Sequence, residues 1–91
     1  LDSTILIKIY QSATFQRADL QNASLNSVYL RGVNLIEADL KGADLTKANL
    51  IKVDLSDANL RGADLSSAYL DGAVLHKAHL HIANLSRALL P

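Results

Sequence analysis

Three histidines lie close together in this chain, at His76, His79 and His81. Neutral imidazole is a common ligand of zinc and other transition metals, so a surface metal site is one interpretation of the cluster. The other interpretation is that three solvated polar side chains occupy variable outward positions. The residues favour the second interpretation, and we expect neither a cofactor nor a resident metal ion.

The carboxylates and hydroxyls are the other groups that could do chemistry. Asp44 and Asp64 can be imagined as an acid/base pair, but such a pair needs a concave, partly desolvated site that shifts pKa values. Serine and threonine are numerous, yet none has the context of a histidine-paired nucleophile. No cysteine is present, which excludes a thiolate metal site and a disulfide framework. Whether any group can react depends on the elements that position it.

A five-residue repeat runs through most of the chain. From Phe15 to Leu90 every fifth residue is apolar, and all of these after Phe15 are leucine. The residue two positions earlier is alanine or, in three units, valine, and the residue between is often Asp or Asn. A helix would scatter leucines at this spacing around its whole surface, and a straight strand would place them alternately on opposite faces. The pattern therefore predicts a short extended piece followed by a corner, repeated as a solenoid.

The outward positions indicate how many sides each coil has. Glycines and Asp/Asn residues recur ten positions apart, which favours an even number of sides and twenty residues per coil. One outer column then pairs opposite charges at both ends. The glycines fall two residues after a central leucine, at the corners, where we expect a positive φ. The column is Arg17, Glu37, Asp57 and Lys77, and the glycines are Gly32, Gly42, Gly62 and Gly72.

Units such as "ADLQN", "ADLKG", "ANLIK" and "ANLRG" resemble the A(D/N)LXX motif of the pentapeptide repeat family, over residues 11–90. The resemblance implies an all-β fold, a right-handed quadrilateral β-helix with four pentapeptides per coil and about four coils. We expect residues 11–91 to form this β-helix and residues 1–10 to form a degenerate first coil or N-terminal edge strand. In that region Lys8 would occupy an inward position, and we expect its ammonium group to reach solvent.

A filled prism with flat walls offers no concave site, so we expect no enzyme activity, and the outward Asp and Asn side chains should hydrogen-bond local backbone or face water. The most informative departures are large apolar residues at outward positions. Tyr29 and Tyr69 are expected to be exposed on the same side, two coils apart, with Ile51 nearby. We predict a candidate interaction surface that comprises Tyr29, Ile51, Tyr69, Val74, Ile82 and Leu89.

These features favour a non-enzymatic structural or protein-interaction module. Some pentapeptide repeat proteins mimic double-stranded DNA and bind DNA gyrase, but mimicry over about four coils needs on the order of ten net negative charges. Nine basic residues here balance nine acidic ones, which disfavours that alternative and nucleic-acid binding. Weak metal binding at the histidines is a further alternative.

We expect a protein partner and no membrane partner, because no apolar run approaches a membrane span of about 18 residues. The last leucine layer has no polar cap in this chain, which predicts end-to-end self-association or a longer parent chain. The resemblance implies a bacterial, cyanobacteria-like source. It is compatible with the cytoplasm, or with the thylakoid lumen or periplasm if a signal peptide has been removed.

Overall fold

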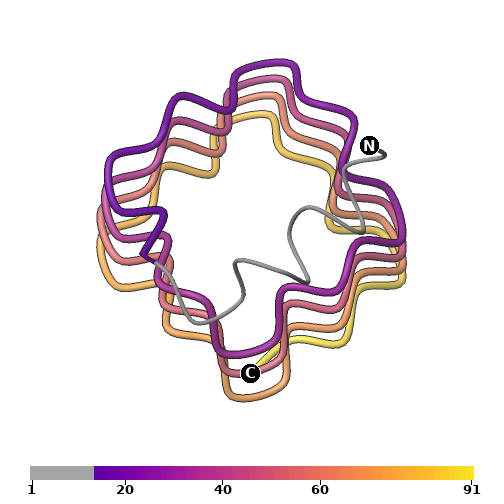
Figure 1. Ribbon diagram of the computed structural model, residues 1–91. Helices are drawn as coiled ribbons and strands as arrows, with labels where there is room; N and C mark the ends of the chain where they lie inside the picture. The colour runs from indigo at the N-terminus through magenta and orange to yellow at the C-terminus, as the bar shows by residue number, and fades with distance from the viewer. Residues whose placement is uncertain (1–13) are drawn as a thin grey trace.

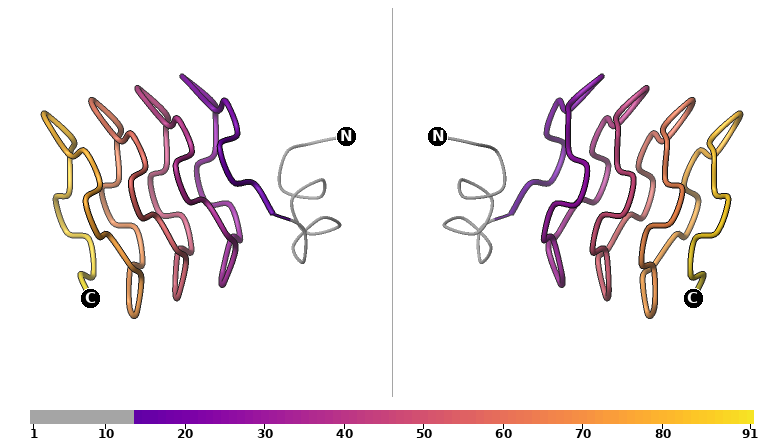
Figure 2. Two further views of the ribbon diagram at one scale, coloured as in Figure 1. Left: turned by 90° about the vertical axis from the view of Figure 1, so that its left-hand side faces the viewer. Right: turned by 90° about the vertical axis from the view of Figure 1, so that its right-hand side faces the viewer.

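The computed structural model describes residues 14–91, which wind into a stack of coils with a four-sided outline (Figure 1). Seen from the side, successive coils lie parallel to one another along a common axis (Figure 2). Twelve parallel bridges join described residues twenty positions apart, from Thr14 with Asn34 to Tyr69 with Leu89. Twenty residues, or four pentapeptides, therefore complete one coil.

Each face comprises a bridged residue and the two residues after it, and each corner is the positive-φ residue that follows. Each face and each corner is named here by its first described residue. The Thr14 face is followed by the Arg17 corner, the Asp19 face, the Asn22 corner, the Ser24 face, the Ser27 corner, the Tyr29 face and the Gly32 corner. Residues 14–91 contain no helix, and the paired residues are isolated bridges rather than longer strands.

Backbone hydrogen bonds run along the axis and hold neighbouring coils together. The amide of Leu40 donates to the carbonyl of Asn59 at 2.8 Å, and the amide of Asn59 donates back to the carbonyl of Ala38 at 2.9 Å. The same two bonds recur on every face where two described coils meet. Because each coil is paired by its backbone to the coils on either side, the repeat needs no long strand to form a sheet-like wall.

The interior is a stack of leucine layers lined by small residues. Leu40, Leu50 and Leu60 are completely buried, as are the alanines two positions before them. Among residues 14–91 no polar or charged residue is buried. Alanine or valine is required beside each leucine because the narrow interior is already filled at normal packing density.

Each corner lies within a four-residue turn. The amide of Ala43 donates to the carbonyl of Leu40 at 3.0 Å, and the residue before Ala43, Gly42, has a φ of 68°. The positive φ predicted for the four glycines is confirmed. The same conformation occurs at all fifteen described corners, because eleven non-glycine residues, Lys47 and Ile82 among them, also have a φ between 54° and 62°. The corner conformation is thus imposed by the fold and not by glycine.

The predicted first coil or edge strand at residues 1–10, with Lys8, lies outside the described residues. No helix in residues 14–91 is long and apolar enough to span a membrane.

Candidate interaction surface

The outward Asp and Asn side chains hydrogen-bond the backbone of the next corner, as predicted from the sequence. In Asn34, for example, Oδ1 accepts a hydrogen bond from the amide of Ile36 at 2.9 Å. The corner amides pointing outward would otherwise have only water as a partner. Nine outward residues make this bond: Asp19, Asn34, Asp39, Asp44, Asn49, Asp54, Asn59, Asp64 and Asn84.

A hydroxyl strengthens this arrangement at three corners. Asp64 Oδ1 accepts hydrogen bonds from Ser66 Oγ at 2.7 Å and from the Ser66 amide at 3.0 Å. These two bonds, the hydroxyl first, lower the pKa of Asp64 and outweigh the smaller opposing effect of desolvation. Thr46 and Ser56 donate their hydroxyls to Asp44 and Asp54 in the same way. The carboxylates are therefore scaffold groups, each committed to its own corner.

The histidines do not form a ligand group. All three are exposed, with His79 and His81 on the Asp19 face and His76 on the Thr14 face. His79 Nδ1 lies 2.7 Å from Arg61 Nη2, a cation that competes with a metal ion for that nitrogen. Within residues 14–91 no three His, Cys, Asp or Glu side chains are placed to hold a metal ion.

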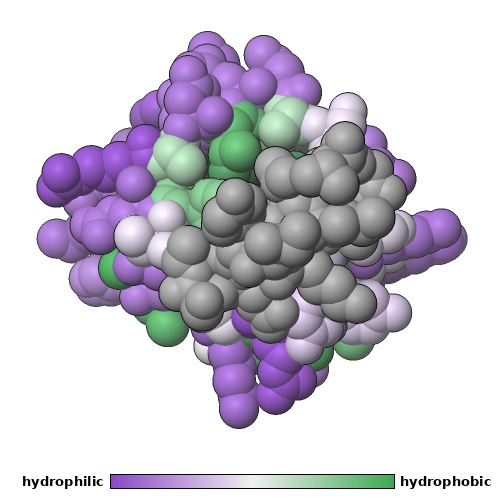
Figure 3. Space-filling model, in the orientation of Figure 1, coloured by the Kyte–Doolittle hydropathy of each residue, from purple (hydrophilic) through white to green (hydrophobic). Residues whose placement is uncertain are grey.

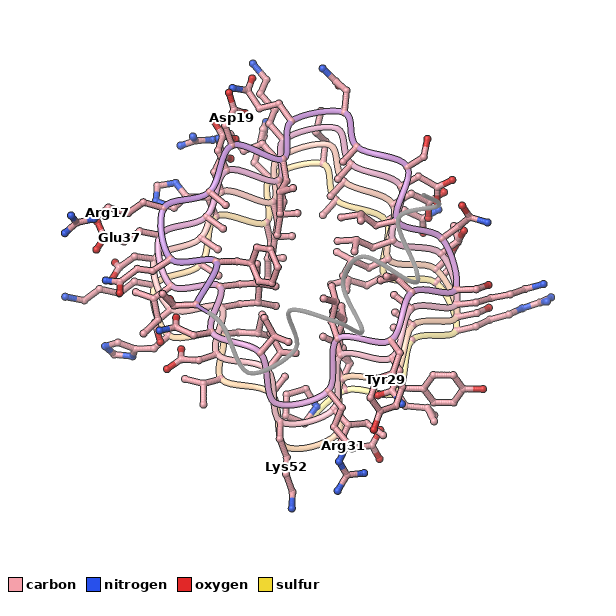
Figure 4. The ribbon with its side chains drawn as sticks, in the orientation of Figure 1. Arg17, Asp19, Tyr29, Arg31, Glu37 and Lys52 are labelled. Atoms are coloured by element: carbon pink, nitrogen blue, oxygen red, sulfur yellow. The ribbon has the colours of Figure 1, made fainter. Side chains whose placement is uncertain are left out.

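The predicted charge column forms one ion pair in the described part of the chain. Arg17 Nε lies 3.5 Å from Glu37 Oε1 at the Arg17 corner (Figure 4). Both side chains are well exposed, so the pair contributes about 0–1 kcal/mol. The twenty-residue register is established by the backbone bridges and does not depend on this pair.

The structure brings together only some of the outward apolar residues. Tyr29, Tyr69 and Leu89 lie in one bridged ladder, separated only by Asn49, and Ile51 belongs to the same face. Tyr69 and Leu89 are 45% and 52% exposed. Tyr29 and Ile51 are only partly exposed. The expectation that both tyrosines are exposed was therefore wrong for Tyr29.

Two predicted members of the surface lie off this face. Val74, 45% exposed, lies on the Thr14 face just beyond the Gly32 corner. Ile82, 77% exposed, lies at the Asn22 corner, on the opposite side of the coil. Sequence reasoning did not include Leu90, which is 57% exposed although it follows the central-leucine pattern.

Cations flank the Tyr29 face, a feature not recognised in the sequence. Lys47 and Arg87 lie at the Ser27 corner, and Lys52 lies at the Gly32 corner. Arg31 lies on the face itself, and Figure 4 shows Tyr29, Arg31 and Lys52 all pointing outward in this part of the molecule. None of these four cations forms an ion pair within residues 14–91, and Asp71 is the one acidic residue on the face. Reading the sequence in columns of twenty would have revealed this grouping.

The described residues thus define a solenoid protein: a β-helix with a solid apolar interior and all of its polar groups on outer walls. The sequence matches the family model for pentapeptide repeats over residues 13–50 and 48–90. The chain belongs to the pentapeptide repeat family, whose members are right-handed β-helices and are generally non-enzymatic structural repeat proteins.

Solved structures of this family superpose closely. Alr5209, a pentapeptide repeat protein from Nostoc Pcc 7120, is 44% identical with a TM-score of 0.86, over 94% of this chain and 73% of that one. Rfr23 from the cyanobacterium Cyanothece 51142 is 38% identical, with a TM-score of 0.79, over 80% of this chain and 50% of that one.

A plant protein is similar as well. The pentapeptide repeat protein AT2G44920 from the Arabidopsis thaliana thylakoid lumen is 32% identical, with a TM-score of 0.81, over 82% of this chain and 52% of that one. The chain thus spans about half the length of this protein and of Rfr23. No curated protein sequence matched the chain.

Proposed function

We propose that this chain is a non-enzymatic protein-interaction module that presents side chains on the flat faces of a rigid solenoid. The observation that carries the proposal is the division between interior and walls. No polar or charged residue in 14–91 is buried, so no ionisable group sits in the desolvated environment that catalysis uses.

The walls suit recognition because their side chains are held at fixed spacing. Residues twenty apart stack at about 4.8 Å, and corner hydrogen bonds of the Asn34 type fix the backbone between them. A surface that is already ordered loses little conformational entropy when a partner binds. The space-filling view shows hydrophilic side chains around most of the rim, with apolar side chains reaching the surface at its lower edge (Figure 3).

Affinity capture from an extract of the source organism tests this proposal. The immobilised chain is compared with four variants, each of which changes the charge of one face: His76→Arg, His81→Arg, Ser86→Arg and, on the cationic Tyr29 face, Arg31→Glu. All four positions are exposed, so folding should be unaffected. A true partner is expected to be lost with one variant and retained by the other three. Absence of any protein above the bare-matrix control, or equal capture by all five proteins, would contradict the proposal.

A further inference from the structure

We propose that the Tyr29 face and the adjoining Gly32 corner form a docking site for an acidic segment of a partner protein that also carries apolar side chains. This inference rests on the proposed interaction function and specifies its surface and the chemistry of its partner. Three observations support it: few scaffold hydrogen bonds, exposed apolar side chains on both sides of one corner, and unpaired positive charge.

The first observation is that only Asn49, among the four ladder residues of this face, makes the side-chain hydrogen bond that stabilises most corners elsewhere. Tyr29 and Tyr69 stand where Asp or Asn would accept the corner amide, and the amides of Arg31 and Asp71 have no hydrogen bond within residues 14–91. Leu89 is the third residue of the ladder that is not Asp or Asn, although Pro91, two positions later, has no amide hydrogen to donate. The other three ladders each have one residue of a type other than Asx, Ser or Thr at most. Stability of the scaffold therefore does not explain the side chains on the Tyr29 face.

The second observation is continuity across a corner. Tyr69 and Val74 occupy neighbouring faces of the same coil, each 45% exposed, and Gly72 lies at the corner between them. Gly72 has no side chain to separate the two faces. The stem of Lys52 lies alongside, since a Cβ built on Gly72 would be 3.3 Å from Lys52 Cγ. With Leu89 stacked next to Tyr69, one partner segment can contact apolar groups on both sides of the corner.

The third observation is the charge that borders these residues. Arg31, Lys47, Lys52 and Arg87 are exposed and form no ion pair within residues 14–91. Asp71 is the acidic residue of the Tyr29 face, and Asp54, which is bridged to Val74, already accepts hydrogen bonds from Ser56. The opposite Asp19 face is balanced by contrast, because Asp19 and Asp39 offset Lys41 and Arg61. Acidic side chains on a partner would supply the missing counter-charges and steer its approach.

A protein segment fits this surface better than a single-stranded nucleic acid. Binding of bases relies on aromatic rings that are free to stack. Tyr29 is only partly exposed, which leaves Tyr69 as the one well-exposed ring on the face. Leu89 and Val74 match aliphatic side chains, which a peptide carries and a nucleic acid does not.

The test measures fluorescence anisotropy of labelled probes titrated with the full chain. The probes are three dodecapeptides, alternating Glu and Leu, alternating Lys and Leu, and alternating Glu and Ser, together with an oligothymidylate of equal length. The Glu–Leu peptide is expected to bind more tightly than every other probe, and its affinity should fall as salt is raised.

Substitutions test whether the Glu–Leu peptide binds at the Tyr29 face and the Gly32 corner. Tyr69→Asn combined with Leu89→Asn is expected to weaken Glu–Leu binding by about tenfold. At position 69 this double variant installs the acceptor that the scaffold prefers, and Leu89 is 52% exposed, so folding should be preserved. Lys47→Ser combined with Lys52→Gly uses residue types already present at the same corners and should reduce both affinity and salt dependence. His79→Asn, the equivalent change on the opposite face, is the control and should bind as the parent does.

The proposal is overturned if the Glu–Leu peptide does not bind, if the Lys–Leu peptide or the oligothymidylate binds as tightly, or if the Tyr69→Asn, Leu89→Asn variant retains full affinity. These outcomes are distinguishable from failure of the interaction function itself. A partner captured from extract and lost only with His76→Arg, His81→Arg or Ser86→Arg would retain the module and reject this surface.

Discussion

Ile82 has a side chain that is poorly suited to its backbone conformation. It is β-branched, 77% exposed and held at a φ of 54°, a region that costs an L-residue about 1–2 kcal/mol. Ile82→Gly is therefore expected to raise the free energy of unfolding by about 1 kcal/mol in urea titrations. Gly62→Ala, at the same corner one coil earlier with a φ of 66°, is the matched reversal and should lower it. A loss of stability in Ile82→Gly would show that its contacts outweigh the strain.

Asp64 links the corner hydrogen bonds to pH. Its pKa is lowered in the folded chain, chiefly by the Ser66 hydroxyl, so its contribution to stability is complete above the unfolded value of about 3.9 and is lost as pH falls through the folded pKa. Asp64→Asn keeps an oxygen acceptor for Ser66 but does not titrate. We expect the variant to be less stable than the parent at pH 7, because a neutral amide is a weaker acceptor than a carboxylate, and the difference to shrink as pH falls below about 4. Parallel acid-unfolding curves for the two proteins would contradict this expectation.

At the scale of a single side of the coil, each central leucine packs in a layer. Its contribution to stability depends on where that layer lies in the stack. Leu50 is completely buried between neighbouring layers, whereas Leu85 is only partly buried. Leu50→Ala is expected to cost about 2–5 kcal/mol and Leu85→Ala clearly less, as measured by urea unfolding. Equal losses would indicate that the layers do not stack in the register described here.

The conformation of each five-residue side was predicted well from the sequence, because the pattern of inward residues determines it. Leucine every fifth residue, with alanine two positions before it, excludes both a helix and a straight strand, and Asn34 or Asp64 at the outward position is explained by the corner amide it binds. The corners themselves were only partly predictable. Lys47 and Ile82 adopt the same positive φ as Gly42, because interior packing overrides their local preference.

The candidate surface was less predictable than the scaffold. Neighbours on a wall are twenty residues apart, so the grouping of Arg31, Lys47 and Lys52 on and beside the Tyr29 face is seen only when the sequence is read in columns of twenty. Exposure was not predictable from residue type and ladder either, because Tyr29 and Tyr69 share both and still differ in exposure. The residues that carry function are those that the repeat does not constrain.

At the scale of the whole 91-residue chain, the last coil carries backbone groups that have no hydrogen bond within residues 14–91. The carbonyl of Ala78 and the amide of Leu80 flank His79 and have no hydrogen bond within residues 14–91, and the same is true of Ala83 and Leu85 on the next face. In an antiparallel strand pair, the amide that follows a residue donates to the carbonyl that precedes the facing residue on the other strand. The facing residue's following amide donates back in the same way. Two such edges related by a two-fold axis are therefore complementary to each other.

We accordingly expect the purified 91-residue chain to self-associate through this coil, with a sedimentation coefficient that rises with protein concentration. Leu90 is 57% exposed beside the partly buried leucines of the same layer, so Leu90→Lys should shift the equilibrium toward the monomer. His81→Lys, an equally charged change on the outer wall of the same coil, should leave the equilibrium unchanged. Sedimentation as a monodisperse monomer at every concentration would contradict this expectation. It would mean that the free energy gained by burying the edge and the leucine layer does not exceed the free-energy cost of association.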